Sequence, residues 1–455
     1  MRRLPPVTGL LAFAFASAAV HAADATGESA ADAAGGGQIT IIEAMERALE
    51  GNEDVGILGE KVKQASAVRV QVLSGLLPWV NASGHYGFEK EVKIVLGSSG
   101  ETTTIQPATT WGYGGQISMA ILDASLFPAL AAAGKTKKAT ELLLVSGKES
   151  VLVATAQAYV TLLFAGEAVA LREAELETRE AHRDEVAARL QADEALALDL
   201  KRAELDVLDA RAALASARVD RALALDALCA LMGDDPATPW EPVDLAATFP
   251  PPPPAPLTET DLASGMESGL SGSPAIEAQD LFKSASKLHA VSGGLSFLPS
   301  ISLGASWDKG PSSFRSPDGT SWAVTFNLSW TLFDGGLTVG KVMEGVSQAA
   351  EAVLETEKTT KAQKALVHAA WLRFNLALEN RDTAAERLDV ARETRSMAEE
   401  RYAAGLATGL EVEDALDACA SAAMGLAGEE MNLTLAWLDY LVASGQFTSF
   451  FEGLE

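Results

Sequence analysis

The strongest constraint on this sequence is that it contains two copies of one pattern. Each copy begins with an amphipathic helical stretch that changes to period-two alternation at a Leu-Pro. Further on, residues 111–123 align with 322–334 at a constant offset (322 − 111 = 211), and Arg189 aligns with Arg401 at nearly the same offset (401 − 189 = 212). Landmarks that keep one spacing indicate a tandem duplication, so the two halves should share one fold.

Each copy supplies two strands. Residues 322–333 alternate apolar and polar side chains, and so do 111–122 and the segments that follow each Leu-Pro. A strand that crosses a membrane needs about 9–11 residues, with aromatic residues at both interfaces. We therefore expect membrane-girdle anchors, with sheet packing as the alternative, at four aromatic positions: Trp111, Tyr113, Trp322 and Trp330.

Long helices follow the strands. Residues 129–190 and 341–403 are rich in Ala, Leu, Glu, Lys and Arg and contain no proline. If each is continuous, it is about 90–95 Å long at 1.5 Å per residue, far longer than a compact domain needs. Second arms over roughly 196–232 and 409–444 complete two helical hairpins.

The chain divides into a leader, two repeats and a connector. Two arginines precede an apolar run and small residues at a cleavage position, which is the layout of a secretory signal peptide over residues 1–22. A proline-rich stretch over 246–257 is typical of an extended, semi-rigid linker. We therefore predict a first repeat over 23–245 and a second over 258–455.

Four strands constrain the assembly. After the signal peptide we expect no transmembrane helix, so the mature chain is either a soluble periplasmic protein or crosses lipid as a β-barrel. Single-chain barrels begin at about eight strands, and an open sheet in lipid leaves its edge amides unpaired. Two copies would give a filled eight-stranded barrel, whereas three give twelve strands around a water-filled bore. The predicted fold class is an α+β membrane protein, a trimeric 12-stranded β-barrel continued by an α-helical periplasmic tunnel.

Composition excludes several functions. The chain has 62 acidic and 35 basic side chains and a formal net charge of −27, which makes it a poor partner for nucleic-acid phosphates. Its two cysteines, Cys229 and Cys419, cannot form a disulfide scaffold, and no His or Cys cluster has zinc-site spacing. No nucleophile elbow or phosphate loop is present. We expect no enzyme activity, no metal site and no cofactor.

The sequence resembles the TolC-like outer-membrane efflux proteins. The resemblance rests on the duplicated order of elements, on the strand-to-helix junction Trp330-Thr-Leu-Phe-Asp-Gly-Gly336, and on the hairpin turn Arg401-Tyr-Ala-Ala-Gly-Leu-Ala-Thr-Gly-Leu-Glu-Val412. It covers residues 39–447 and implies a passive homotrimeric duct in outer-membrane lipid. It also implies partners: a periplasmic adaptor (membrane fusion) protein and an inner-membrane RND pump or ABC exporter.

The resemblance assigns a gate to the turns of the hairpins. It implies an acidic aperture ring built from Glu411 and Asp414, for which ordinary acidic residues at a helix N-terminus are the alternative. It also implies a latch between Tyr402 and Asp199 that holds the tip shut. This sequence departs from the family pattern at the first turn, where we place Glu194 opposite Gly405.

The junctions between strands and helices have a structural role in this interpretation. We expect Asp123 and Asp334 to cap the helices that follow the strands rather than to form a catalytic pair. Gly335 and Gly336 should allow the chain to bend from strand to helix. The competing function is a soluble periplasmic coiled-coil adaptor or scaffold, which long hairpins also fit but which does not predict two copies of alternating strands.

Overall fold

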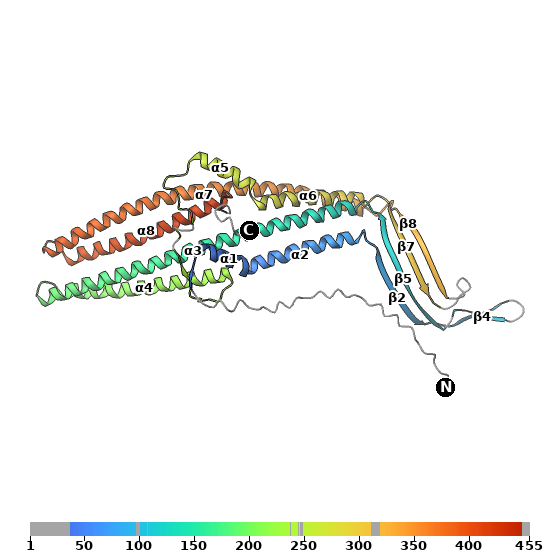
Figure 1. Cartoon of the computed structure of the whole chain (residues 1–455), viewed down its shortest axis with the longest axis horizontal. Coiled ribbons are helices and arrows are strands. Elements are labelled where there is room, and N and C mark those ends of the chain that lie inside the picture. The colour runs from blue at the N-terminus through green and yellow to red at the C-terminus, as the bar shows by residue number, and fades with distance from the viewer. Residues whose placement is uncertain are drawn as a thin grey trace, which may run out of the picture.

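The computed structural model describes residues 37–96, 101–106, 108–236, 238–243, 245, 249–310 and 319–447, with the side chains of 94–96 and 101–106 left out. The predicted signal peptide lies outside these residues. The molecule is elongated, with helices along most of its length and a sheet at one end (Figure 1). The turns of both helical hairpins lie at the opposite end, so the sheet and the hairpin tips are separated by the full helical body.

The sheet has four antiparallel strands in the order β2-β5-β7-β8. They are β2 (Trp79–Phe88), β5 (Thr109–Leu122), β7 (Ser300–Lys309) and β8 (Thr320–Ser329). The two repeats meet where β5 pairs with β7. The outer strands β2 and β8 each pair on one side only among the described residues, and nearly every residue of both is exposed. The sheet is therefore open at both edges.

Two details of the strands differ from the prediction. The predicted strand over 322–333 ends at Ser329, because Trp330–Phe333 leave the ladder before the turn into the next helix. The longer loop of the first repeat contains an extra hairpin of β3 (Val92–Leu96) and β4 (Glu101–Gln106). This hairpin extends beyond the sheet, away from the helices (Figure 1).

Two long hairpins form the helical body. The first consists of α3 (Leu126–Gln191) and α4 (Ala197–Met232), and the second of α7 (Leu337–Ala403) and α8 (Gly409–Ala443). All four match the predicted ranges within a few residues. The predicted start of α3 is three residues late because Pro128 lies in its first turn, where a proline costs no helical hydrogen bond. At 1.5 Å per residue α3 and α7 are each about 100 Å long.

The helical stretch before each strand pair is broken into two helices. The first repeat has α1 (Ile41–Gly51) and α2 (Glu53–Ser74), and the second has α5 (Glu259–Ser271) and α6 (Pro274–Leu295). The breaks are signalled by new N-caps, at which Asn52 accepts from Asp54 N and Ser273 accepts from Ile276 N. The same break in both repeats supports the duplication.

Glycines allow these short helices to touch the ends of the long ones. A Cβ on Gly51 would lie 2.2 Å from the carbonyl oxygen of Met232, and a Cβ on Gly269 would lie 2.4 Å from that of Ala443. The α4 and α8 helices then terminate at Gly233 (φ 75°) and Gly445 (φ 70°), both in the left-handed region. Each repeat therefore has a backbone-to-backbone crossing at mid-height that only glycine permits.

The main core lies at this level. It joins α1, α3, α4 and α8 with the parallel two-residue strands β1 (Gln38–Ile39) and β6 (Glu241–Pro242). Tyr159 is 1% exposed, and its hydroxyl donates to the carbonyl oxygens of Ile39 and Val243. The side chains around it are apolar, which explains why the most apolar part of α3 is found here.

This segment corrects one expectation. Of the described helices, α3 alone is long and apolar enough to cross a membrane by length and composition, and 39% of its most apolar window is buried inside the chain. No such helix was expected from the sequence. In the fold, Val151, Ala156 and Val160 face the main core, so the apolar composition serves helix packing.

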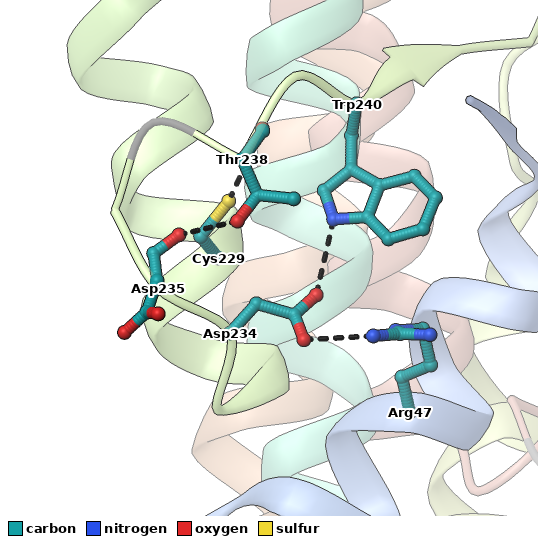
Figure 2. Close-up of polar contacts among 6 residues, drawn as sticks. All are labelled: Arg47, Cys229, Asp234, Asp235, Thr238 and Trp240. Carbon is teal, nitrogen blue, oxygen red and sulfur yellow. Dashed lines mark hydrogen bonds and ion pairs between the residues drawn. The ribbon is translucent and has the colours of Figure 1, made fainter. Parts of the chain in front are cut away.

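Polar contacts join α1 to the segment that follows α4 in the first repeat (Figure 2). Arg47 of α1 donates to Asp234 at 2.7 Å and lies 4.9 Å from the centre of the Trp240 ring, while Trp240 Nε1 donates to the other Asp234 oxygen at 3.0 Å. The buried Cys229 thiol contacts the Thr238 carbonyl oxygen. Among the described residues both cysteines are free.

The proline-rich linker runs against the second hairpin. Trp437 Nε1 donates to the Pro250 carbonyl oxygen at 3.1 Å, and Asn375 accepts from Leu257 N at 2.8 Å. Trp371 Nε1 donates to the Leu257 carbonyl oxygen. The aromatic and amide side chains of α7 and α8 thus satisfy a backbone that prolines prevent from forming regular structure.

Candidate functional site

The candidate site is the tip, where the two hairpins turn. The backbone is the same in both turns: Glu194 N donates to Arg189 O at 2.8 Å, and Leu406 N donates to Arg401 O at 2.8 Å. Each closes a Schellman-type helix end with one residue in the left-handed region. That residue is Asp193 (φ 61°) in the first turn and Gly405 (φ 70°) in the second. The predicted pairing of Glu194 with Gly405 is therefore wrong by one residue.

The second arms begin with equivalent N-caps. Leu196 N donates to the Asp199 carboxylate at 3.2 Å, whereas the Thr408 hydroxyl accepts from Glu411 N at 3.4 Å. Asp199 and Glu411 therefore occupy the same first-turn position, where a carboxylate stabilises the helix dipole. Glu411 and Asp414 are both exposed, one turn apart on the face of α8 that points away from the core.

Tyr402 lies against the first hairpin. The guanidinium of Arg189 lies 4.1 Å from the centre of its ring, and Arg189 Nη1 donates to the Tyr402 carbonyl oxygen at 3.3 Å. Burial raises the pKa of the Tyr402 hydroxyl, so the side chain is neutral. The contact that joins the two turns is thus made by the ring of Tyr402, while the Asp199 carboxylate is occupied at its own helix start.

A buried arginine joins the hairpins further from the turns. Arg179 of α3 is 3% exposed and contacts Asp417 of α8 through one nitrogen, with Asp206 of α4 at 3.8 Å from the other. Glu413 of α8 is 8% exposed beside this group, and burial raises the pKa of its carboxyl. A charge removed from water this completely is stable only while its partners hold it, which makes Arg179 a tie between the hairpins.

His182 lies one turn along α3 from Arg179. Its ring is 8% exposed, Nε2 has no hydrogen-bond partner in the described part of the chain, and the Tyr402 ring lies 6.3 Å away. Burial lowers the pKa of the imidazole, although Glu185 on the same helix opposes the shift. The sequence analysis named neither Arg179 nor His182 as a site residue.

The junction residues lie at the opposite end of the helices. The Asp334 carboxylate accepts from Gly336 N at 3.0 Å and Thr338 N at 2.8 Å, and Asp123 accepts from Ser125 N at 3.0 Å. Each aspartate thus binds donors at the start of a long helix. Gly335 (φ 70°) and Gly336 (φ 95°) adopt left-handed conformations that favour glycine, as expected for residues between a strand and a helix.

Aromatic side chains mark both ends of the sheet. At the end far from the helices Trp111 stacks on Tyr113, with ring centres 6.2 Å apart, and Trp307 is paired with Trp322 across β7 and β8. At the end near the helices Trp330 follows β8, and its Nε1 donates to the Phe297 carbonyl oxygen at 3.2 Å. Trp322 and Trp330 are 76% and 57% exposed, so neither is held mainly by packing within the chain.

Comparisons with known proteins agree with this geometry. Residues 267–445 match the family model of the outer membrane efflux protein. The match covers most of the second repeat, which carries the hairpin turn quoted for the resemblance. No curated protein sequence matches it.

Solved membrane channels share the fold. CusC superposes with a TM-score of 0.75 at 18% identity, covering 89% of this chain and 91% of the other. The Campylobacter jejuni CmeC outer membrane channel gives 0.74 at 18% identity over 90% and 86%. The Neisseria gonorrhoeae MtrE outer membrane channel, solved in an open state, gives 0.70 at 20% identity over 90% and 89%. The helical body and sheet therefore have the same fold as these channels.

The resemblance recognised from the sequence is confirmed over residues 267–445, where the chain matches an outer membrane efflux protein. This match supports the predicted outer-membrane localisation. The matched family consists of channel proteins rather than known enzymes. The efflux-protein family also disfavours the soluble adaptor that the sequence left as an alternative.

A signal for the missed tip residues exists in the sequence. Arg179, His182 and Val186 are spaced three and four residues apart, and all three are buried on one face of α3. Two polar side chains on a stripe that ends in Val186 would have indicated a polar contact between helices. They were missed because arginine in an Ala- and Glu-rich helix of an efflux protein is ordinarily solvated.

Proposed function

We propose that this protein is the outer-membrane channel of a tripartite efflux or type I secretion system, a passive duct from the periplasm to the exterior. Three copies join their sheets into one twelve-stranded barrel, and their helical hairpins form a tunnel below it. Transport energy is supplied at the inner membrane by an RND pump or ABC exporter. A periplasmic adaptor connects that transporter to the tips.

The open sheet carries this proposal. The edge strands β2 and β8 leave their outer backbone groups unpaired within the chain, and an unpaired edge is costly in lipid. Large apolar side chains cover one face of the edge strands: Val80, Tyr86, Phe88, Trp322, Phe326 and Leu328, each at least 66% exposed. Pairing β8 of one copy with β2 of the next satisfies the edges and turns these side chains toward lipid.

The tip is the gate in this proposal. Glu411 and Asp414 of three copies place six carboxylates at one constriction, where they repel one another and attract cations. In the closed tip the Tyr402 hydroxyl would bind Asp199, in addition to the contact of the Tyr402 ring with Arg189. The buried Arg179 links the hairpins further from the turns. The exposure of Glu411 and Asp414 supports the ring, because neither is used in packing the chain.

Disulfide trapping tests the shared barrel. Cysteines replacing Ser83 at mid-β2 and Thr325 at mid-β8 of the same chain should cross-link neighbouring copies into covalent dimers and trimers under oxidation. Each single variant is the matched control, because one engineered cysteine cannot propagate a ring. The cross-linked trimer should conduct ions in planar bilayers. A protein that remains monomeric in detergent and leaves bilayers silent would refute the proposal.

A further inference from the structure

A cavity of about 670 Å³ opens where the two repeats meet at mid-height, away from the tip. It lies between α3 of the first repeat and α7 of the second, at the level where α8 ends and α6 begins. Its apolar wall includes Val153, Leu366, Val442 and Phe447. Cavities of roughly 300–1,000 Å³ with apolar walls and a few convergent polar groups are the usual form of small-molecule sites.

Two carboxylates, of Glu149 and Asp439, and one guanidinium, of Arg373, line this cavity. Asp439 of α8 accepts from Gln157 Nε2 at 3.0 Å and has the exposed Arg373 as its nearest compensating charge. Glu149 of α3 has neither a hydrogen bond nor an ion pair to any described residue. Burial raises the pKa of both carboxyl groups. The negative charge of Glu149 is therefore left without a partner at the wall of an apolar cavity.

The helix ends that line the cavity contribute a net negative partial charge, like the carboxylates. The C-terminal ends of α5 and α8 contribute Gly269, Gly272, Val442 and Ala443 to its lining. One helix N-terminus, that of α6 at Pro274, faces it from the other side. C-terminal ends carry partial negative charge, so two such ends against one N-terminus favour a cation.

We propose that this cavity binds a small organic cation, a protonated amine or quaternary ammonium on an apolar body. The charged group lies between Glu149 and Asp439, and the apolar body packs on Val153, Leu366 and Phe447. The volume admits a drug-sized molecule, and the apolar wall distinguishes it from a site for a bare metal ion. The inference does not depend on the proposed duct function, because the cavity is complete within one chain.

Ethidium binding to the purified full-length protein in lipid nanodiscs tests the site. Its fluorescence should rise with saturation at one dye per chain, and Glu149→Gln should weaken the affinity about tenfold, the usual effect of losing a charged contact. Ala154→Phe, which fills the cavity from α3, should abolish binding. Glu167→Gln is the matched control, since it removes one charge from α3 outside the cavity.

Unchanged affinity in both Glu149→Gln and Ala154→Phe would overturn the site. Equal binding of the anionic dye anilinonaphthalene sulfonate would overturn its preference for cations. Conductance of each variant in bilayers is recorded in parallel. Loss of dye binding with normal conductance supports the cavity independently of the duct, and dye binding to a non-conducting protein would overturn the duct alone.

Discussion

The two hairpin tips have the same backbone and different chemistry. Both turns close with the same hydrogen bonds and both second arms begin with a carboxylate in the first turn. The first turn places Asp193 in a left-handed conformation, whereas the second uses Gly405. Two residues further into the second arm the charges are reversed, with Lys201 and Arg202 on α4 and Glu413 and Asp414 on α8. The duplication thus preserved geometry and left the electrostatics free to diverge.

The largest expected effect is that of replacing Arg179, the buried side chain that links the two hairpins near their chemically different tips. Arg179→Met removes the cation between Asp206 and Asp417. Because the Asp417 side chain is 72% exposed, we expect a cost of about 2 kcal/mol, below that of a fully buried charge pair. We expect a lower thermal midpoint for the detergent-solubilised protein and higher resting conductance in bilayers. Arg183→Met is the control, because among the described residues Arg183 forms its ion pair with its exposed neighbour Asp184 alone. An equal loss in both variants would contradict a linking role for Arg179.

The aperture ring is tested by Glu411→Ala combined with Asp414→Ala. Removing six carboxylates per trimer should raise single-channel conductance and weaken block by a trivalent cation about tenfold, since the attraction depends on the summed charge. Asp209→Ala, an exposed carboxylate on α4, is the control. Unchanged cation block in the double variant would remove these residues from the gate.

Two variants show whether the hydroxyl of Tyr402 or the contact of its ring with Arg189 holds the tip closed. Tyr402→Phe removes the hydroxyl that would bind Asp199 but keeps the ring over Arg189. If the hydroxyl holds the tip, this variant should leak small antibiotics in cells; if the ring contact holds it, Arg189→Met should leak instead. Cation–π contacts contribute about 0.5–2 kcal/mol, so either effect should be smaller than that of Arg179→Met. Wild-type permeability in both variants would exclude both latches.

Exchanging Asp193 and Gly405 tests whether the left-handed backbone conformation determines the stability of each turn. Gly405→Asp should destabilise the second turn by about 1 kcal/mol, because side chains disfavour the left-handed region, and Asp193→Gly should stabilise the first by a similar amount. Amide hydrogen exchange at the two turns measures both. Changes of the same sign in the two turns would show that something other than backbone conformation determines their stability.

The smallest effect is pH-dependent. Burial raises the pKa of the Glu413 carboxyl, so the folded protein binds this proton more tightly than the unfolded chain does. The ionised carboxylate therefore lowers the stability of the fold once the pH rises above the ordinary pKa of a glutamate. Glu413→Gln should therefore raise the thermal midpoint slightly at pH 7. The gain should vanish near pH 4, where the carboxyl is protonated in both states. A gain that persists at pH 4 would indicate packing instead.

Much of the fold was readable from the sequence because its signals are local. Period-two alternation located β2, β5, β7 and β8, and proline-free runs located α3 and α7. The end of β8 was misplaced because alternation continues through Trp330 to Phe333, although the chain has already left the ladder. The β3–β4 hairpin was not predicted; its second strand, β4, is rich in Thr and has no alternating apolar face in the sequence.

The tip was less predictable because its contacts are long-range. Glu411 and Asp414 follow from a turn motif, but the pairing of Arg179 with Asp417 joins residues 238 apart in sequence. Nothing in the local sequence around Arg179 specifies which carboxylate it meets. The one-residue error at Glu194 arose because residue type suggested a counterpart for Gly405, whereas the conformation belongs to Asp193.

The length of α3 and α7 has a mechanical consequence. Their neighbours stop at mid-height, where α4 and α8 end and α2 and α6 begin, so in the described chain only these two unbroken rods connect the tip with the sheet. A force applied at the hairpin turns therefore reaches the sheet through α3 and α7 alone. The shorter helices meet the ends of α4 and α8 at the glycine crossings, so they can shift there while α3 and α7 stay continuous.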